Sequence, residues 1–216
     1  MKKIVAVNCS PRKGWNTDLM VQAAAKGAKE AGASVQYFDL CRLEQYTGCV
    51  SCFGCKLAPN EGRCVCLDDL HQVLEAIRGA DGLIIGTPVY LSTISAGMHA
   101  LIERLVFQNV TYQKEQKTYR KRRIPVLFIA TSGVAAERYE EVGYDRMIET
   151  WRGMLDRSVG PTAVVISGDV LQVYDYSKYN WTIFDPEKKK QGREERFPQD
   201  LLKAEEAGAA LAGQEA

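Results

Sequence analysis

A chain of 216 residues with 46% hydrophobic and 25% charged residues has the composition of a globular protein that can bury its own core. Its 28 Lys and Arg nearly balance 27 Asp and Glu, so the charge gives no reason to expect nucleic acid or an anionic membrane as a partner. No apolar run approaches the roughly 18 residues of a membrane-spanning helix, and the run after Lys3 is too short for a secretion signal. We therefore expect a cytoplasmic protein whose thiols stay reduced.

The hydrophobic pattern predicts five strands that alternate with helices along the chain. The strands are expected at Ile4–Val7, Ser34–Asp39, Gly82–Thr87, Ile124–Thr131 and Thr162–Ser167. Helices are expected up to about Ala31, then over Asp68–Arg78, Ala96–Asn109, Glu137–Asp156 and Pro198–Leu211. The first helix is expected to begin at a cap formed by Asn16, Thr17 or Asp18, and the third at a Ser95 cap. The last helix is expected to have its proline in the first turn and a frayed tail beyond it.

Most of these strands are uninterrupted apolar runs, which is typical of strands buried on both faces of a parallel sheet. The pattern therefore predicts an α/β fold: a doubly wound five-stranded parallel sheet between two layers of helices. We expect one domain over residues 1–216, with a cysteine-rich loop at 48–67 after the second strand. The C-terminal arm, 170–216, contains an aromatic stretch, Val173–Phe184, which we expect to dock on the sheet or on a partner subunit.

The loop after the first strand carries groups suited to a phosphate ester. Its sequence, Asn8-Cys-Ser-Pro-Arg-Lys-Gly-Trp-Asn-Thr17, matches neither the G-x-G-x-x-G pattern of dinucleotide-binding folds nor a P-loop. Ser10, Asn16 and Thr17 supply side-chain donors, Arg12 supplies charge, and the free N–H groups of the next helix would point to the same place. The alternative is a polar turn with a helix cap, and these residues alone do not decide between the two.

Two further loops follow the third and fourth strands. Because ligands of doubly wound sheets lie beyond the carboxyl ends of the strands, we expect these loops beside the first one. The third strand is expected to stop at the proline, with three apolar residues at the sheet edge, and the fourth leads into small, flexible residues. Each loop alone is an ordinary connection, but the three together suggest a flavin mononucleotide (FMN) in a flavodoxin-like fold. The residues concerned are Pro88, Val89, Tyr90, Leu91, Thr131, Ser132 and Gly133.

Five cysteines crowd the loop after the second strand: Cys49, Cys52, Cys55, Cys64 and Cys66. The chain has seven cysteines, and an odd number in a reducing compartment argues against a full set of disulfides. The first three, at three-residue steps, can converge on an iron–sulfur cluster whose fourth ligand comes from further along the chain. Zinc would also accept four thiolates, although its sites are usually two C-x2-C pairs, and free thiols are the third interpretation.

A resemblance to the iron–sulfur flavoprotein family, within the NADPH-dependent FMN reductase-like group of flavodoxin fold, runs from Met1 to about Ser167. The motifs that carry it are Ser10-Pro-Arg12, Asn16-Thr17, the cysteines ahead of Asp68-Asp69, Ala80-Asp-Gly82, Pro88-Val-Tyr90 and Glu103-Arg104. The sequence departs from the family's pattern at four places: Cys9 where glycine is usual, His99 where lysine is common, a longer gap at 56–63, and the extra Cys66.

The resemblance implies where two cofactors bind. The FMN phosphate is expected on Ser10, Arg12, Asn16 and Thr17. Its ring is expected against Pro88, Val89, Tyr90 and Leu91, with Thr131, Ser132 and Gly133 over the other edge. A [4Fe–4S] cluster is expected on Cys49, Cys52, Cys55 and Cys64, with Cys66 as the alternative fourth ligand. The resemblance also implies a homo-oligomer (dimer or tetramer) with electron transfer across a subunit interface, and NAD(P)H or a ferredoxin-like protein as electron donor.

The sequence thus predicts an FMN-dependent oxidoreductase that passes electrons between FMN and a [4Fe–4S] cluster. Because the cofactors carry the chemistry, no side chain is assigned as an acid or a base. One alternative is an NAD(P)H-dependent FMN or quinone reductase without a cluster. A second is a zinc-stapled or cofactor-free interaction module. The basic segment 114–123 is expected to be a solvated connection.

Overall fold

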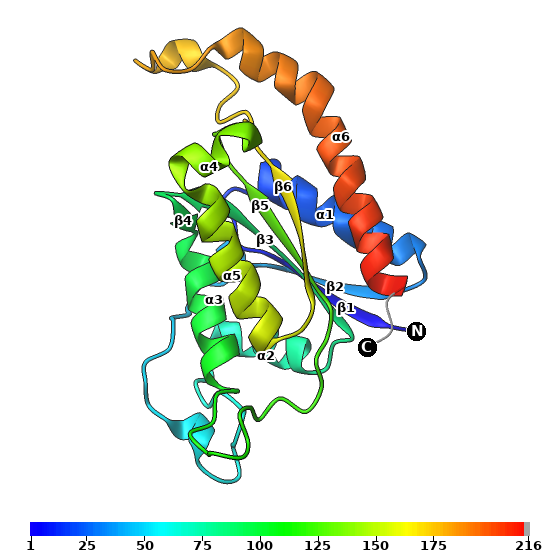
Figure 1. The fold of residues 1–216 in the computed structure, drawn as a ribbon, viewed down its shortest axis with the longest axis vertical. Helices are drawn as coiled ribbons and strands as arrows, with labels where there is room; N and C mark the ends of the chain where they lie inside the picture. Colours follow the sequence, from blue (N-terminus) through cyan, green and yellow to red (C-terminus); the bar gives the residue numbers. More distant parts are fainter. Residues whose placement is uncertain (214–216) are drawn as a thin grey trace.

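The computed structural model describes residues 1–213 as a parallel sheet with helices on both faces (Figure 1). The five long strands lie in the order β2-β1-β3-β5-β6, each parallel to its neighbours. They are β1 (Lys3–Asn8), β2 (Ser34–Asp39), β3 (Gly82–Tyr90), β5 (Val126–Thr131) and β6 (Thr162–Ser167). The predicted doubly wound sheet is confirmed. Its strand order reverses at β1, so the crevice where ligands of such sheets lie opens between the carboxyl ends of β1 and β3.

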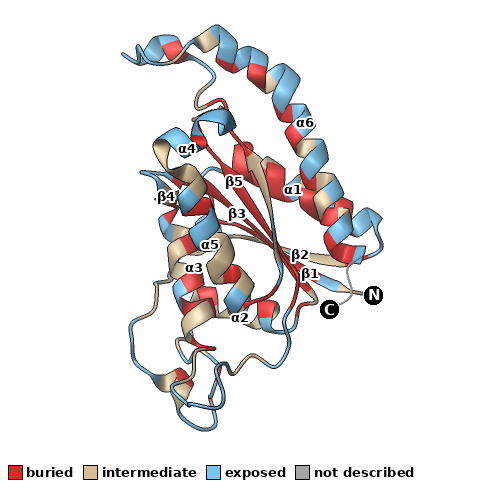
Figure 2. Cartoon of the chain, viewed as in Figure 1, coloured by how far each residue is buried: buried red, intermediate tan, exposed pale blue. Residues whose placement is uncertain are grey.

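Two layers of helices bury the two faces of this sheet. One layer consists of α1 (Asn16–Glu30) and α6 (Pro186–Gly213), and the other of α2 (Asp69–Arg78), α3 (Ala96–Phe107), α4 (Tyr139–Val142) and α5 (Tyr144–Ser158). Strand β1 contributes to both cores, because its side chains alternate between the two faces of the sheet. Ile4 and Ala6 belong to the core under α1 and α6, and Val5 and Val7 belong to the core on the other face. Figure 2 shows buried strands between helices whose outer faces are exposed.

Helices α1 and α6 approach each other through glycines. A Cβ added at Gly27 would lie 1.9 Å from the carbonyl oxygen of Glu205, and one at Gly208 would lie 1.9 Å from that of Ala24. Lys26 of α1 also donates to Glu205 at 2.8 Å. Only residues without a side chain allow this backbone contact, which fixes α6 against α1 and positions its N-terminal half at the carboxyl edge of the sheet.

Helix α6 begins twelve residues earlier than predicted. Asp185 accepts hydrogen bonds from the N–H groups of Glu187 and Lys188, and Pro186 occupies the first helical position, so together they start the helix. Pro198 therefore lies inside α6 rather than in its first turn. The polar stretch between the two prolines has no apolar periodicity that would have predicted this. The expected tail beyond Gly213 lies outside the described residues.

Strand β3 continues through Pro88, where the sequence predicted it to stop. Pro88 still pairs in register with Thr131 of β5. Beyond it, β3 turns into a hairpin with β4 (Thr93–Ile94), in which Val89 lies opposite Ile94. The turn residues Leu91 and Ser92 have φ of +48° and +59°, as a two-residue hairpin turn requires. The missing N–H of a proline is tolerated here because the parallel ladder ends at this point.

Two helix boundaries also differ from the predictions. Trp15 is the N-terminal cap residue of α1, so Asn16, Thr17 and Asp18 form its first turn instead of capping it. The long helix predicted before β6 is divided into α4 and α5 at Gly143, whose φ of +75° breaks the helical path. Ser95 caps α3 as predicted, by accepting from the N–H of Met98. Over residues 1–213, no helix is both long and apolar enough to cross a membrane.

Candidate functional site

A hollow open to solvent lies at the carboxyl edge of the sheet, where β1, β3 and β5 end. Ten of the eleven residues predicted to hold a flavin line it: Ser10, Arg12, Asn16, Thr17, Pro88, Val89, Tyr90, Thr131, Ser132 and Gly133. Leu91 does not, because it sits at the tip of the β3–β4 hairpin with 98% of its surface exposed. The three loops that the sequence placed together do meet, whereas the binding role of each residue stays a prediction.

The loop between β1 and α1 is shaped by its own side chains. The Asn8 side-chain oxygen accepts from the Ser10 N–H at 3.0 Å, and the Ser10 hydroxyl accepts from the Arg12 N–H at 3.1 Å. Asp18, in the first turn of α1, accepts from the Gly14 N–H at 2.6 Å. These bonds hold the loop around the N-terminus of α1, where free N–H groups and the helix dipole favour an anion.

A segment after β6, residues 170–172, covers this loop, and no motif in its sequence predicted this position. The Asn16 amide donates to the carbonyl oxygen of Leu171 at 2.8 Å, and the Arg12 guanidinium donates to that of Gln172 at 2.7 Å. Arg12 also lies over the Trp15 ring, 4.0 Å from its centroid. A Cβ at Gly133 would meet the Gln172 amide at 2.4 Å, so this glycine permits the close approach.

Helix α6 adds a second guanidinium that sequence reasoning missed. Arg193 donates to the Asn16 side-chain oxygen at 2.8 Å and stacks on Phe197 at 4.2 Å. Burial lowers the pKa of Arg193 below that of a free arginine. No carboxylate among residues 1–213 forms an ion pair with Arg193 or with Arg12. Two unneutralised cations therefore flank Asn16 at the N-terminus of α1, as suits a site for an anion.

Hydrogen bonds from Tyr139 and Lys189 hold the residues after β5 that line the hollow. Ser132 shares a hydrogen bond of 2.7 Å with the buried Tyr139 hydroxyl. The Lys189 ammonium group of α6 donates to the Gly133 carbonyl at 2.8 Å. On the β3 side, burial raises the pKa of Tyr90, which is 44% exposed. Tyr90 is therefore an uncharged aromatic side chain at neutral pH, with a face available to a ligand.

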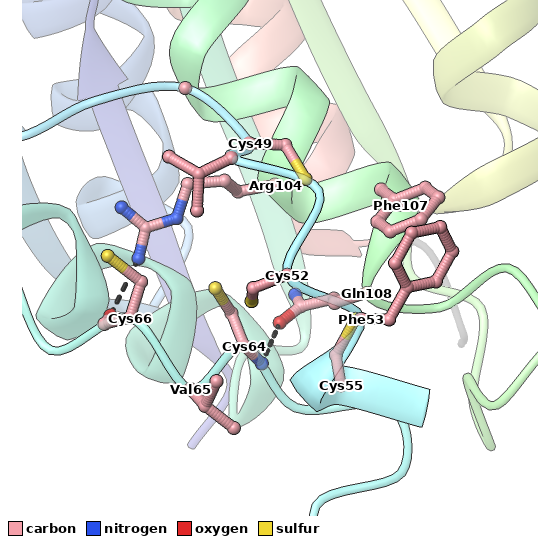
Figure 3. A pocket seen from close by; sticks show the side chains of 12 residues that line it. Cys49, Cys52, Phe53, Cys55, Cys64, Val65, Cys66, Arg104, Phe107 and Gln108 are labelled. Atoms are coloured by element: carbon pink, nitrogen blue, oxygen red, sulfur yellow. Dashed lines mark hydrogen bonds between the residues drawn. The ribbon is translucent and has the colours of Figure 1, made fainter. Parts of the chain in front are cut away.

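All five cysteines of the loop at 48–67 line a second hollow, which is open to solvent (Figure 3). Cys49, Cys52 and Cys55 come from the first half of the loop, and Cys64 and Cys66 from its return. The wall opposite is the C-terminal half of α3, through Arg104, Phe107 and Gln108. All these thiols are free.

Side chains of α3 and of the loop hold the cysteine loop in place. Glu103 accepts from the Cys49 N–H at 3.0 Å, and Gln108 accepts from the Cys64 N–H at 3.0 Å. Lys56 donates to the carbonyls of Phe107 and Val110, at the end of α3 where a cation is favoured. Neither the Lys56 nor the Gln108 contact could be predicted from the sequence, because nothing in the pattern brings residue 56 beside residue 107.

Two glycines allow the loop to close around the cysteines. A Cβ at Gly48 would lie 2.2 Å from the Glu103 carboxylate, and a Cβ at Gly54 would lie 2.4 Å from the Val65 side chain. Close packing at both positions therefore excludes a larger residue in this conformation. Gly48 and Gly54 therefore let the loop pass close to α3 and to its own return segment.

Arg104 is the buried charge of this hollow, with 2% of its surface exposed. Its Nη1 contacts both carboxylate oxygens of Asp68, at 2.6 and 2.7 Å, and its Nη2 donates to the Cys66 carbonyl at 2.8 Å. Burial by itself would lower the pKa of Arg104, but its interactions with Asp68 and Cys64 raise the pKa above the usual value. The guanidinium therefore stays charged among the thiols.

Thiolates are suitable ligands both for a zinc ion and for an iron–sulfur cluster. In a tetrahedral zinc site, Zn–S bonds of about 2.3 Å bring the sulfurs to roughly 3.8 Å from each other. No three His, Cys, Asp or Glu side chains of the described chain converge closely enough for one ion. In an iron–sulfur cubane each thiolate binds a different iron, so its ligands surround a larger space. Burial raises the pKa of Cys55 and of Cys66, so binding a metal there would release protons.

Matches to known sequences agree with this geometry. The profile of the family described as NADPH-dependent FMN reductase matches residues 2–189. An iron–sulfur flavoprotein of Methanocaldococcus jannaschii is 31% identical over 115 residues, 53% of this chain and 58% of that protein. Another, of Methanosarcina thermophila, is 35% identical over 104 residues, 48% of this chain and 52% of that protein. The chain spans about half the length of the curated relatives it matches, and the expected resemblance is confirmed.

Solved structures share the fold along the whole chain. An NAD(P)H:quinone oxidoreductase from Methanothermobacter marburgensis superimposes with a TM-score of 0.73 at 17% identity, covering 100% of this chain and 99% of that one. An azoreductase from Bacillus anthracis str. Sterne gives 0.69 at 17% identity, covering 97% and 100%. At these identities the likeness shows the fold alone, and it confirms the flavodoxin-like architecture.

Proposed function

Because the chain belongs to the NADPH-dependent FMN reductase family, we propose that it exchanges electrons between FMN and a [4Fe–4S] cluster held by the same flavodoxin-like domain. The flavin-dependent oxidoreductase activity follows from the family, and the cluster is the further step. The observation that carries it is the cysteine hollow: five free thiols around one space, beside a buried cation.

The carboxyl-edge hollow is the proposed FMN site. Ser10, Arg12, Asn16 and Thr17, with the N–H groups that begin α1, bind the phosphate. The isoalloxazine lies between the β3–β4 hairpin and the loop after β5. The wall residues that exclude water from it are Pro88, Val89, Tyr90, Thr131, Ser132 and Gly133. FMN, when bound, accepts electrons in pairs and releases them singly.

Cys49, Cys52, Cys55 and Cys64 are the proposed cluster ligands. The choice of Cys64 over Cys66 rests on backbone contacts: the Cys66 carbonyl accepts from Arg104 Nη2 at 2.8 Å, which holds Cys66 against that guanidinium. The N–H of Cys64 is also held by Gln108. We therefore assign Cys64 to the ligand set with the first three cysteines, while Cys66 lies beside Arg104 (Figure 3).

The two sites lie at different levels of α3. Ser95 at its start bonds to the carbonyl of Cys9 at the carboxyl edge, and Arg104 lies in the cysteine hollow. Nine residues of helix separate them, which is about 14 Å. Electrons leaving the flavin site therefore have to cross a helix-length gap or pass to a neighbouring chain.

A second copy of the chain is the proposed neighbour. The cysteine loop exposes apolar side chains around its hollow, with exposed fractions of 61% for Val50, 64% for Leu57 and 81% for Leu67. Such residues are the kind that an oligomer covers. NAD(P)H, or a ferredoxin-like protein, is the proposed electron donor, and the family favours the nucleotide.

The experiment uses protein purified and kept without oxygen, reconstituted with FMN, and titrated with NADPH or NADH while the visible spectrum is followed. The Cys52→Ser variant should keep FMN reduction by the nucleotide but lose iron and the transfer of single electrons to a one-electron acceptor. Cys41→Ser, an exposed thiol outside both hollows, should behave as the wild type. A wild type whose FMN is reduced by neither nucleotide would exclude the NAD(P)H step. Equal single-electron transfer by Cys52→Ser would exclude the cluster's role.

A further inference from the structure

One nitrogen of Arg104 is left without a partner in the cysteine hollow. The side chain is buried, and Nε is one of the few buried polar atoms of the described chain that make no hydrogen bond. The other two nitrogens of the guanidinium already have acceptors. Nη1 donates to Asp68 and, at 3.3 Å, to the Thr47 carbonyl, and Nη2 donates to the Cys66 carbonyl. A buried donor with no acceptor is unfavourable, so this atom calls for an acceptor inside the hollow.

The lining of the hollow limits what that acceptor can be. Apart from the five cysteines, the lining side chains are apolar, except for Arg104 itself and Gln108. The Gln108 oxygen already accepts from the Cys64 N–H. The remaining acceptors are sulfur atoms, either cysteine thiolates or the sulfides of a bound cluster.

We propose that Arg104 is a positioning residue that raises the reduction potential of the cluster by donating its Nε–H to a sulfur there. This inference rests on the proposed function, because it needs a cluster in the hollow. Reduction adds one electron, supplied from the flavin, and no proton or bond is exchanged with Arg104. The reduced cluster carries one more negative charge, which a buried cation and its hydrogen bond stabilise more than they stabilise the oxidised cluster.

Asp68 acts in the opposite direction from the same place. Its carboxylate accepts from Arg104 Nη1 at 2.6 Å and from the Thr47 N–H at 3.2 Å. Asp68 therefore stays ionised and offsets part of the positive charge near the cluster. Replacing Arg104 should therefore lower the reduction potential of the cluster, and replacing Asp68 should raise it.

The test is a redox titration of the anaerobic, cluster-loaded protein, with the reduced cluster followed by electron paramagnetic resonance and the iron content measured on each sample. Arg104→Gln should lower the midpoint potential, and Arg104→Lys, which keeps a charge but has no Nε–H, should lower it by less. Asp68→Asn should raise it. Arg63→Gln removes an exposed charge that is paired with Glu75 at 3.0 Å, and should leave the potential unchanged.

Several results would overturn the inference. If Arg104→Gln keeps its iron and its potential does not move, Arg104 has no such role. If Arg104→Gln and Asp68→Asn shift the potential in the same direction, a general loosening of the loop is the cause. If Arg104→Gln loses its cluster, the midpoint potential of Asp68→Asn becomes the test. A potential of Asp68→Asn that is unchanged or lower than that of the wild type contradicts the inference. A wild type with neither iron nor sulfide overturns both the inference and the proposed cluster, whereas the other results overturn the role of Arg104 alone.

Discussion

The hydroxyl of Thr17, in the first turn of α1, lies 2.7 Å from the hydroxyl of Thr131, at the end of β5. Both side chains are buried, and both residues line the carboxyl-edge hollow. The pair joins the loop proposed for the phosphate to the loop proposed to cover the flavin ring. One hydroxyl donates to the other, and the acceptor's own hydrogen remains available for a ligand.

Thr17→Val should weaken FMN binding by roughly tenfold or more, because a hydrogen bond to a charged group contributes about 1.5–3 kcal/mol. Thr131→Val removes the same Thr–Thr bond but leaves the phosphate loop intact, and should weaken binding less. The quenching of FMN fluorescence on binding measures both. A larger loss for Thr131→Val would place the phosphate elsewhere.

Arg193→Gln should distinguish FMN from riboflavin. Arg193 lies beside Asn16 without a carboxylate partner in the described chain, so its charge is available to the phosphate that only FMN carries. We expect FMN affinity to fall by about tenfold, consistent with the loss of one charge-assisted hydrogen bond, and riboflavin affinity to stay unchanged. Arg196→Gln, on the same helix but paired with Asp169 at 3.2 Å, is the charge-matched control. An equal loss for both ligands would mean that Arg193 acts only by supporting the loop.

Gly48→Ala should reduce the iron content of the protein. The new Cβ would lie 2.2 Å from the Glu103 carboxylate and force it away from the Cys49 N–H. Gly32→Ala is the matched control, because Gly32 has φ of +88° but no atom within 4 Å of an added Cβ. It should cost about 1–2 kcal/mol of stability through backbone strain and leave iron unchanged. Full iron in Gly48→Ala would show that the loop does not need this conformation.

Gly208→Ala should destabilise the fold, because its Cβ would lie 1.9 Å from a carbonyl oxygen of α1. Forcing the two helices apart should lower the free energy of unfolding by about 1–3 kcal/mol or more. Gly213→Ala, in the same helix with no atom within 4 Å of an added Cβ, should be neutral or slightly stabilising. Urea unfolding of the two variants gives the comparison, and equal stabilities would contradict the close packing of α1 on α6.

Cys64→Ser and Cys66→Ser separate the two candidates for the fourth ligand. We expect Cys64→Ser to lose most of its iron and the absorbance of the cluster, and Cys66→Ser to keep both. The reverse result would make Cys66 the ligand. Retention of iron by both single variants would mean that either thiol can complete the site, and the double variant would then have to lose it.

The parts of the fold that followed from the sequence are those with a local signal. Apolar runs marked most of the five parallel strands, and the strand order brought ten of the eleven flavin-site residues to one edge. The spacing of the cysteines was enough to expect them around one space. In each case residues close together in the chain predicted the local element. The known topology of parallel sheets then predicted that the loops meet at one edge.

The missed features depend on contacts between distant residues. Arg193 and Asn16 are 177 residues apart, and no pattern in either segment predicts their contact. Pro88 was expected to end β3 because prolines usually end strands, but the antiparallel partner β4 continues it. The start of α6 lacks an apolar stripe, since much of its first half is exposed. Tertiary packing, rather than local preference, decides such cases.

The most direct test of the whole account is the content of iron, zinc and acid-labile sulfide per chain, measured on protein purified without oxygen together with its visible spectrum. We predict about four irons and about four sulfides per chain with bound FMN, and no stoichiometric zinc. FMN without iron or sulfide would contradict the cluster and leave a flavin-dependent reductase. One zinc per chain without iron would assign the cysteine hollow to a structural metal instead.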